Sequence, residues 1–262
     1  MSHPVTFHGK TALVTGASTG IGVDLAARLA AEGSNLVLVA RSADKLNAVA
    51  ERLRGERGVT VTVIPLDLGA PESAEKLVAE LDERGIRVDI LLNNAGFGSH
   101  GDLAQADPVR MAEQVQLNVG TLVGLTTRLL PGMVQRRDGV IMNVASTAAF
   151  QAVPHMAVYG ATKAFVLSFS RALWAETRGT GVRVLAIAPG ATETPFFSIA
   201  GEHASLGKRR RPEQVVDTAF RALRAGRPSA VDGFVNACLA RIPARLVSER
   251  LLIAVTERAM RA

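Results

Sequence analysis

The chain has 262 residues, 48% of them hydrophobic and 21% charged, with a formal net charge of +6, and it is long enough to bury a large core within one α/β domain. No run of 18 apolar residues is free of charges or of Pro and Gly breaks, and the first residues lack an apolar signal-peptide core, so we expect a cytoplasmic protein without a transmembrane segment. A single cysteine, Cys238, excludes an internal disulfide, and five scattered histidines without ligand spacing favour a protein without a metal site.

Short apolar runs alternate with helical patterns along the chain. The runs are rich in Val, Ile, Leu and Ala, and they are Thr11–Thr15, Asn35–Ala40, Val59–Pro65, Asp89–Asn93, Gly139–Val144 and Val182–Ala188. Such runs are typical of strands buried on both faces of a parallel sheet. Between them, segments such as Gly22–Ala31 and Ala74–Arg84 repeat apolar residues every three or four positions. The alternation predicts a single-domain, Rossmann-like α/β fold over residues 1–262, a doubly wound parallel sheet with helices on both faces.

The first apolar run leads directly into a glycine-rich turn, TGASTGIG, and then into a helical pattern. Gly16, Gly20 and Gly22 permit a tight bend, close approach of a pyrophosphate, and close packing of helix on strand. The amino end of the following helix offers amide donors to phosphates. A purely structural turn is the alternative, but the strand–turn–helix context favours a nucleotide site.

The second run ends in Ala40, Arg41 and Ser42. Enzymes that prefer NAD usually place an acidic residue there to bind the ribose 2′-hydroxyl, whereas a guanidinium pairs with the 2′-phosphate of NADPH. Arg41 could also be an ordinary exposed arginine at the start of a loop. Together with the glycine turn, it favours NADP(H).

Tyr159, the only tyrosine, lies four residues before Lys163, so both side chains project from one face of a helix. A nearby ammonium lowers the pKa of a phenol, which is otherwise about 10. Ser146 ends the run GVIMNVAS, where a hydroxyl could polarise a carbonyl or merely cap a turn. Asn118 interrupts a helical pattern, where an amide is usually solvent-facing.

Taken together, these motifs resemble the short-chain dehydrogenase/reductase family. The resemblance covers roughly residues 7 to 195, with no departure at a catalytic position, and rests on TGASTGIG, Asp67, NNAG (Asn93–Gly96), Asn118, Ser146, Tyr159, Lys163 and PGATET (Pro189–Thr194). It implies that Tyr159 is the general acid in carbonyl reduction and that Lys163 lowers its pKa and binds the nicotinamide ribose. It also implies that Ser146 holds the substrate oxygen and that Asn118 maintains a water link from Lys163 to solvent.

The resemblance also implies a set of NADP(H) contacts. The glycine turn and Arg41 would bind the adenosine-phosphate half, Asp67 and Leu68 would flank the adenine, and Ile187–Thr194 would border the nicotinamide. The full set is Gly16, Ser18, Thr19, Gly20, Ile21, Gly22, Arg41, Ser42, Asp67, Leu68, Asn93, Ala95, Gly96, Tyr159, Lys163, Pro189, Gly190, Thr192 and Thr194.

Substrate recognition is expected in Phe97–His100, in Thr147–Met156 and in the substrate-side segment 196–233. Phe97, Phe150, Phe196 and Phe197 suggest an apolar pocket, although such aromatics are often plain core, and His155 is more simply a structural loop histidine than a substrate contact. A hydrophobic acyl, steroid or lipid-like ketone therefore fits better than a small charged acid.

The C-terminal extension, 234–262, departs from the commonest family members and predicts a helix that starts near Pro243. Three roles stay open for it beside simple packing on its own subunit: a subunit contact, a lid on the substrate cleft, or a basic element at a lipid surface. The extension resembles that of reductases of acyl chains or lipids, and the family usually forms dimers or tetramers.

All of the excess positive charge lies in the segment from Lys208 to the end, where 12 Lys and Arg face 5 Asp and Glu. This distribution fits an anionic partner or a solvated, arginine-rich face. No recognition motif accompanies the run Lys208–Arg211, so we expect no nucleic-acid partner. An NADPH-binding regulator or scaffold without catalysis is the alternative to an oxidoreductase, and the complete set of Asn118, Ser146, Tyr159 and Lys163 argues against it.

Overall fold

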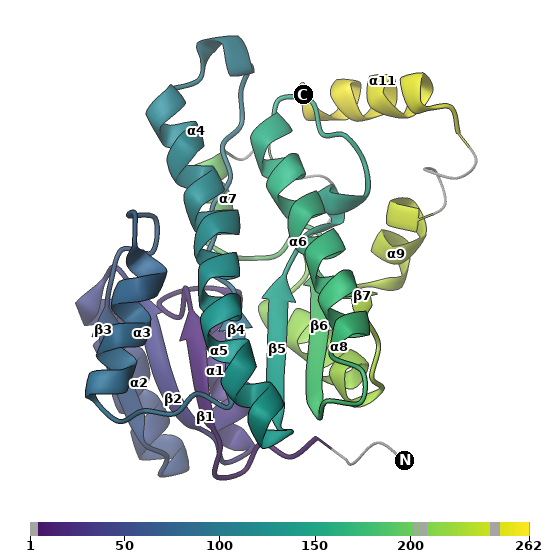
Figure 1. Cartoon of the computed structure of the whole chain (residues 1–262). Coiled ribbons are helices and arrows are strands. Elements are labelled where there is room, and N and C mark those ends of the chain that lie inside the picture. The colour runs from purple at the N-terminus through teal and green to yellow at the C-terminus, as the bar shows by residue number, and fades with distance from the viewer. Residues whose placement is uncertain (1–4, 202–203, 205–208, 242–246, 262) are drawn as a thin grey trace.

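The computed structural model describes residues 5–201, 204, 209–241 and 247–261. Seven strands form one parallel sheet in the order β3-β2-β1-β4-β5-β6-β7 (Figure 1). Every neighbouring pair is parallel, so all carboxyl ends lie at one edge. The strands are β1 (Thr11–Thr15), β2 (Asn35–Ala40), β3 (Val61–Pro65), β4 (Ile90–Asn93), β5 (Gly139–Val144), β6 (Val182–Ala188) and β7 (Ser229–Val231).

The six predicted strands are confirmed, with small differences at two starts. β3 begins at Val61 rather than Val59, and β4 at Ile90 rather than Asp89. The Asp89 carboxylate instead accepts a hydrogen bond from the Thr11 backbone N–H at 3.1 Å, so it fixes the start of β1. The sequence did not predict β7, because its three residues are too few to show a pattern.

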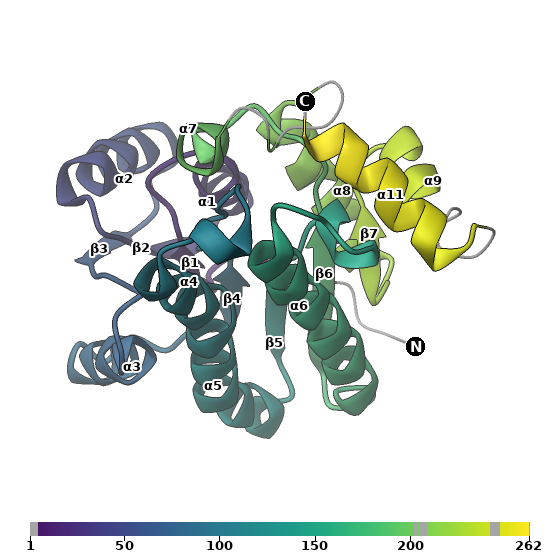
Figure 2. The same ribbon diagram turned by 90° about the horizontal axis from the view of Figure 1, so that it is seen from above.

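Helices cover both faces of the sheet, as predicted (Figure 2). Side chains at successive strand positions point to opposite faces, so Val14 packs in one core layer and Leu13 in the other. The first layer is covered by α1 (Ile21–Ala31), α2 (Ala43–Arg57) and α8 (Pro212–Arg224), and the second by α3 (Ser73–Glu83), α5 (Leu122–Arg136) and α6 (Ala157–Glu176). The predicted helices Gly22–Ala31 and Ala74–Arg84 are thus correct to within one residue.

Shorter elements gather above the carboxyl ends of the strands (Figures 1 and 2). These are α4 (Pro108–Val115), a 3₁₀ turn at Thr147–Phe150, α7 (Phe196–Ala200), α9 (Phe234–Arg241) and α11 (Glu249–Met260). A π-helical turn, Gln116–Thr121, joins α4 to α5. The predicted helix start near Pro243 lies outside the described residues, and the helix that follows begins after Ser248.

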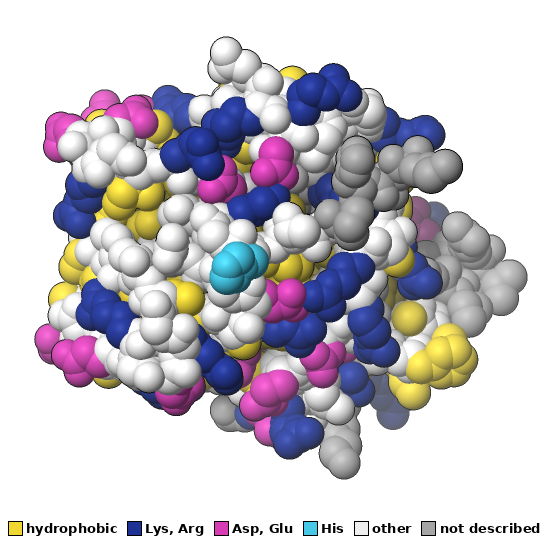
Figure 3. All heavy atoms as spheres, turned by 90° about the horizontal axis from the view of Figure 1, so that it is seen from below, with side chains coloured by type: hydrophobic (Ala, Val, Ile, Leu, Met, Phe, Trp, Pro, Cys, Tyr) yellow, Lys and Arg dark blue, Asp and Glu magenta, His cyan; other side chains and the backbone are white. Residues whose placement is uncertain are grey.

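The opposite edge of the molecule carries basic and acidic side chains side by side (Figure 3). Ion pairs there include Lys10–Asp138 at 2.6 Å and Arg224–Glu32 at 2.5 Å, so several of the basic side chains at this edge have an acidic partner. Among the described residues no helix is long and apolar enough to cross a membrane, and no group of three or more metal-ligating side chains occurs.

Candidate active site

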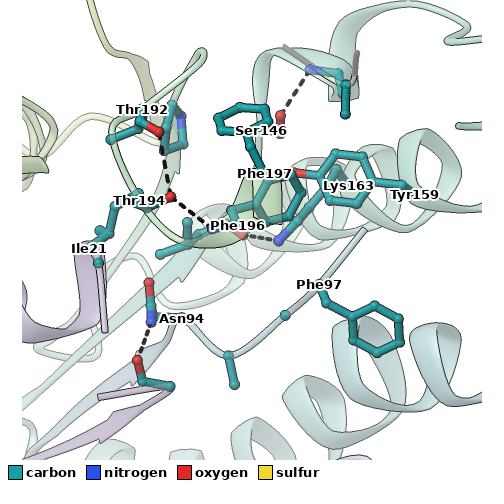
Figure 4. A pocket seen from close by; sticks show the side chains of 18 of the residues that line it. Ile21, Asn94, Phe97, Ser146, Tyr159, Lys163, Thr192, Thr194, Phe196 and Phe197 are labelled. Atoms are coloured by element: carbon teal, nitrogen blue, oxygen red, sulfur yellow. Dashed lines mark hydrogen bonds between the residues drawn. The ribbon is translucent and has the colours of Figure 1, made fainter. Parts of the chain in front are cut away.

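A cavity of about 730 Å³ lies at the carboxyl ends of the strands. It brings together motifs that are far apart in the sequence: the glycine turn after β1, Arg41 after β2, Asp67 after β3, and Ser146 after β5. Tyr159 and Lys163 reach it from α6 (Figure 4). This is the edge at which ligands bind in open α/β sheets.

The glycine turn shapes one wall of the cavity. Gly16 and Gly20 have φ of +66° and +55°, and a Cβ on Gly16 would lie 2.8 Å from the amide nitrogen of Asn94. Gly22 does not line the cavity, in contrast to its predicted direct contact. A Cβ there would lie 2.2 Å from the Gly16 carbonyl oxygen, so Gly22 packs helix on turn instead. No side chain caps the first turn of α1, which leaves its amino end available to an anion.

The end of the cavity next to β2 and β3 carries two cations. Arg41 and Ser42 line it as predicted, together with Asp67 and Leu68. Lys45, one helical turn further along α2, also lines it. Lys45 was not predicted, because its place in the lining depends on the direction in which α2 leaves the sheet.

Ser146 and Tyr159 lie together on the neighbouring wall. The Ser146 hydroxyl accepts a hydrogen bond from the Ala148 backbone N–H at 3.1 Å, so this serine both caps the 3₁₀ turn and faces the cavity. Burial raises the pKa of Tyr159 to about 12, and a hydrogen bond with Ser146 acts in the opposite direction. In the cofactor-free protein the phenol is therefore protonated throughout the neutral range.

Lys163 is buried one turn beyond Tyr159, with its ammonium nitrogen 5.9 Å from the centre of the phenol ring. It donates a hydrogen bond to the Val144 carbonyl at 2.8 Å (Figure 4). An ammonium can donate three hydrogen bonds, and the described part of the chain supplies an acceptor for one of them. Burial lowers the pKa of Lys163 to about 8.

Asn118 lies behind the cavity wall rather than on it. Its side chain accepts from the Phe97 backbone N–H at 3.1 Å and donates to the Phe97 carbonyl and to the Thr162 hydroxyl. These bonds fix the turn after NNAG and tie it to α6. The Asn118 side chain therefore positions this wall of the cavity. Asn118 itself lies in the π-helical turn, where the backbone departs from regular α-helical bonding.

Asn93 also lies beneath the cavity, not on its surface, in contrast to its predicted direct contact. Its amide donates to the side chains of Asn143 at 2.9 Å and Thr126 at 3.2 Å, and the Asn143 amide donates to Ser170 at 2.9 Å. The four side chains are buried and link β4, β5, α5 and α6. Asn94, Ala95 and Gly96 line the cavity instead.

The segment after β6 lines the remaining wall through Pro189, Gly190, Thr192 and Thr194, as predicted, whereas Ile187 and Ala188 are buried in the strand. Arg210 holds this segment: its backbone N–H donates to the Ala191 carbonyl at 2.9 Å. The Arg210 guanidinium binds the fully buried Asp232 with two hydrogen bonds, of 2.5 and 3.3 Å. Arg210, within the basic run Lys208–Arg211, therefore has a structural role: it ties the segment after β6 to Asp232.

Replacing Asp232 with Ala should lower the free energy of unfolding by about 3 kcal/mol, because it leaves a partly buried guanidinium and the Thr218 hydroxyl without their carboxylate. Asp217→Ala, on the neighbouring helix α8, is the matched control. Asp217 pairs with Arg28 at 2.8 Å and is 62% exposed, so its loss should cost less than about 1 kcal/mol. Urea unfolding measures the free energy of unfolding of both variants. Equal decreases in the two variants would contradict the structural role of the Arg210–Asp232 pair.

The far end of the cavity is largely apolar. Phe97, Phe196 and Phe197 line it as predicted, with Val153 and Met156. Phe150 does not; it packs in a core cluster beneath Arg171.

His155 does not line this cavity either. It binds the Asp102 carboxylate at 2.6 Å in a loop, which agrees with the structural role favoured for it.

Several lining residues come from the C-terminal extension and were not predicted. They are Asn236, Leu239, Ala240, Thr256 and Met260, from α9 and α11. Helical periodicity alone cannot say which distant surface a C-terminal helix covers, so no sequence pattern could have identified them.

A glycine turn, a lysine-paired tyrosine and a serine around one cavity of a doubly wound parallel sheet define an oxidoreductase. Residues 10–204 match the sequence profile of the short chain dehydrogenase family, and the chain belongs to that family.

Similar proteins have been described. A putative ketoacyl reductase of Streptomyces coelicolor is 38% identical over 76% of this chain and 77% of its own length. The human very-long-chain 3-oxoacyl-CoA reductase is 32% identical over 87% of this chain and 72% of its own. Among solved structures, a short-chain dehydrogenase from Sphingobium yanoikuyae in complex with NADPH superposes with a TM-score of 0.82, at 35% identity, over 88% of this chain and 90% of its own.

Proposed function

We propose that this chain catalyses NADP(H)-dependent reduction of a hydrophobic carbonyl compound, or the reverse oxidation of the alcohol. The observation that carries the proposal is the cavity itself, in which Ser146, Tyr159 and Lys163 meet at a point continuous with the glycine turn and with Arg41. A non-catalytic NADPH-binding scaffold would not need this arrangement.

The residues present fit a dinucleotide cofactor. The uncapped amino end of α1 and the tight glycine turn suit a pyrophosphate. Two of the three hydrogen bonds that the Lys163 ammonium can donate have no acceptor among the described residues, and ribose hydroxyls would supply such acceptors. NADP(H), when bound, supplies the hydride that is exchanged with the carbonyl carbon.

We assign the remaining steps to side chains. Ser146 donates a hydrogen bond to the substrate oxygen and orients the carbonyl. Tyr159 then gives its phenolic proton to that oxygen, which becomes the alcohol hydroxyl. The Lys163 ammonium stabilises the resulting phenolate until a proton returns from solvent. In the oxidation direction the same groups act in reverse. The water link through Asn118 stays a prediction.

Arg41 should decide the choice between NADPH and NADH. A guanidinium forms charge-assisted hydrogen bonds with a 2′-phosphate, which NADH lacks. Arg41→Ala should therefore weaken NADPH binding by at least about tenfold, since such bonds contribute roughly 1.5–3 kcal/mol, and leave NADH binding nearly unchanged. Titration of the fluorescence of each reduced cofactor measures both dissociation constants. Equal losses for the two cofactors would contradict the assignment, and Lys45→Ala shows whether the neighbouring cation shares the role.

The substrate class rests on the part of the cavity beyond Tyr159, where aromatic and aliphatic side chains lie beside the polar side chains of Gln151 and Thr256. The names of the similar ketoacyl and 3-oxoacyl-CoA reductases support a ketone flanked by apolar carbon. Within that class we propose an acyl, steroid or lipid-like ketone.

The test is a spectrophotometric screen of the purified chain with NADPH against aldehydes, 3-oxoacyl thioesters, steroid ketones and simple ketones. Loss of the absorbance of the reduced cofactor on any ketone supports the proposal. Tight NADPH binding with no turnover across widening panels would instead favour the cofactor-binding scaffold.

A further inference from the structure

The C-terminal helix α11 forms one wall of the cavity at its substrate end. Thr256 and Met260, one turn apart, both line the cavity, although they follow Tyr159 by about a hundred residues in the sequence. Their side chains are 4% and 1% exposed. Figure 2 shows α11 above the carboxyl edge of the sheet, on the same side of the molecule as α9.

Met260 belongs to the same apolar cluster as the proposed proton donor. The buried members of this cluster are Val153, Met156, Tyr159, Ala200 and Met260, and the ring of Phe196 packs on it 5.4 Å from the ring of Tyr159. Met260 therefore extends from α11 into the apolar surroundings of the Tyr159 ring.

Two side chains from distant segments hold α11 in this place. The Gln151 amide, beyond the 3₁₀ turn, donates to the Thr256 hydroxyl at 3.2 Å. His100, in the loop after β4, donates through Nε2 to the Met260 carbonyl at 3.0 Å. Both segments belong to the regions expected to recognise substrate. The helix is thus fixed to the substrate end of its own chain at both Thr256 and Met260.

The outer face of α11 is exposed and lies away from the cavity. Leu251 and Val255 lie one turn apart on the opposite side and are 56% and 59% exposed. They do not line the cavity. The helix therefore supplies an internal control, because its two faces can be changed independently.

We infer that Met260 is a specificity-determining residue that limits the size of the substituent on the α11 side of the substrate carbonyl. This inference rests on the proposed function. It narrows the substrate class to unsymmetrical ketones whose smaller substituent faces α11 and whose larger, apolar substituent extends away from it. Among the roles considered for the C-terminal extension, it selects the lid on the substrate cleft.

The experiment compares isomeric ketones such as 2-, 3- and 4-octanone, or the equivalent series built on the best ketone of the screen. Within such a series the total number of apolar carbon atoms is constant while the smaller substituent of the carbonyl grows. The wild-type chain should prefer the methyl ketone. Met260→Ala should raise the ratio of kcat/KM for the propyl over the methyl ketone by at least about tenfold, and Met260→Phe should lower it. Met260→Leu, which nearly conserves volume, should leave it within about twofold.

Loss of stability cannot imitate this result, because it lowers the rates on all three isomers together. Leu251→Ser and Val255→Ser on the outer face should leave the ratio unchanged, and NADPH affinity should stay constant in every variant. If the wild-type chain turns over ketones but Met260→Ala and Met260→Phe leave the ratio unchanged, the inference is wrong and the proposed function stands. If the wild-type chain reduces no carbonyl compound, the proposed function fails, and the inference fails with it.

Discussion

Tyr159→Phe should reduce turnover by at least about a thousandfold while NADPH affinity stays within about twofold of the wild type. The substitution removes the hydroxyl to which we assign proton transfer to the substrate oxygen. It keeps the ring that packs against Phe196 and Met156, so the fold and the cofactor wall should persist. Single-turnover measurements with saturating NADPH separate the chemical step from binding. Turnover close to that of the wild type would refute the assignment of Tyr159 as the proton donor.

The same tyrosine permits a direct measurement of its ionisation. Tyr159 is the only tyrosine in the chain, so the phenolate absorbance that appears on raising the pH belongs to one residue. In the cofactor-free protein we expect little phenolate below pH 10, because burial raises the pKa to about 12. Addition of NADP⁺ should lower this midpoint, since its nicotinamide carries a positive charge. The Tyr159→Phe variant provides the blank for the titration.

Lys163→Met should abolish turnover and yet stabilise the cofactor-free protein at neutral pH. Burial lowers the pKa of Lys163 from 10.5 to about 8, which corresponds to a cost of about 3 kcal/mol for holding the charge in the folded state. Loss of the hydrogen bond to the Val144 carbonyl offsets about 1 kcal/mol of the gain. Thermal or urea unfolding at pH 7 should therefore give a variant about 2 kcal/mol more stable than the wild type. With NADPH present the order should reverse, because the variant loses a cofactor contact.

The difference in stability between the wild type and Lys163→Met should depend on pH. Below pH 8 the lysine is protonated in both folded and unfolded states, and the full cost of burial is present. Between pH 8 and 10.5 the folded protein releases the proton before the unfolded chain does, so wild-type stability rises relative to the variant. The advantage of Lys163→Met should shrink over that interval. Lys45→Met, which replaces an exposed lysine of the same cavity, should show no comparable gain in stability at pH 7.

The order of strands and helices could be predicted because six of the strands are near-continuous apolar runs, each followed by its own turn. Thr11–Thr15 and Gly139–Val144 were predicted to the residue. The edge strand β7 could not be, because three residues in Ser229–Val231 carry no periodicity. Its place in the sheet depends on pairing with β6, which is a tertiary contact.

The site residues were likewise predictable where they follow a strand in the sequence, and not where their position depends on tertiary contacts. Motifs at strand ends, such as Ser146 and Arg41, could be placed in the cavity because the parallel sheet gathers those ends. Gly22 and Asn93, predicted as cofactor contacts, pack behind the cavity wall, since sequence does not distinguish a lining residue from the residue that packs behind it. Met260 depends on the docking of a distant helix. The oligomeric state stays a prediction, because it depends on surfaces between chains.

The strand order also has a consequence for how the chain folds during synthesis. β1 lies in the middle of the sheet, between β2, which follows directly, and β4, which begins at Ile90. The backbone groups of β1 that pair with β4 therefore stay unpaired until the ribosome has made more than seventy further residues. Such non-local parallel pairing is slow, and an open apolar strand edge promotes association of incomplete chains. We expect recovery of the native protein to improve at lower synthesis temperature and with chaperones that shield strand edges.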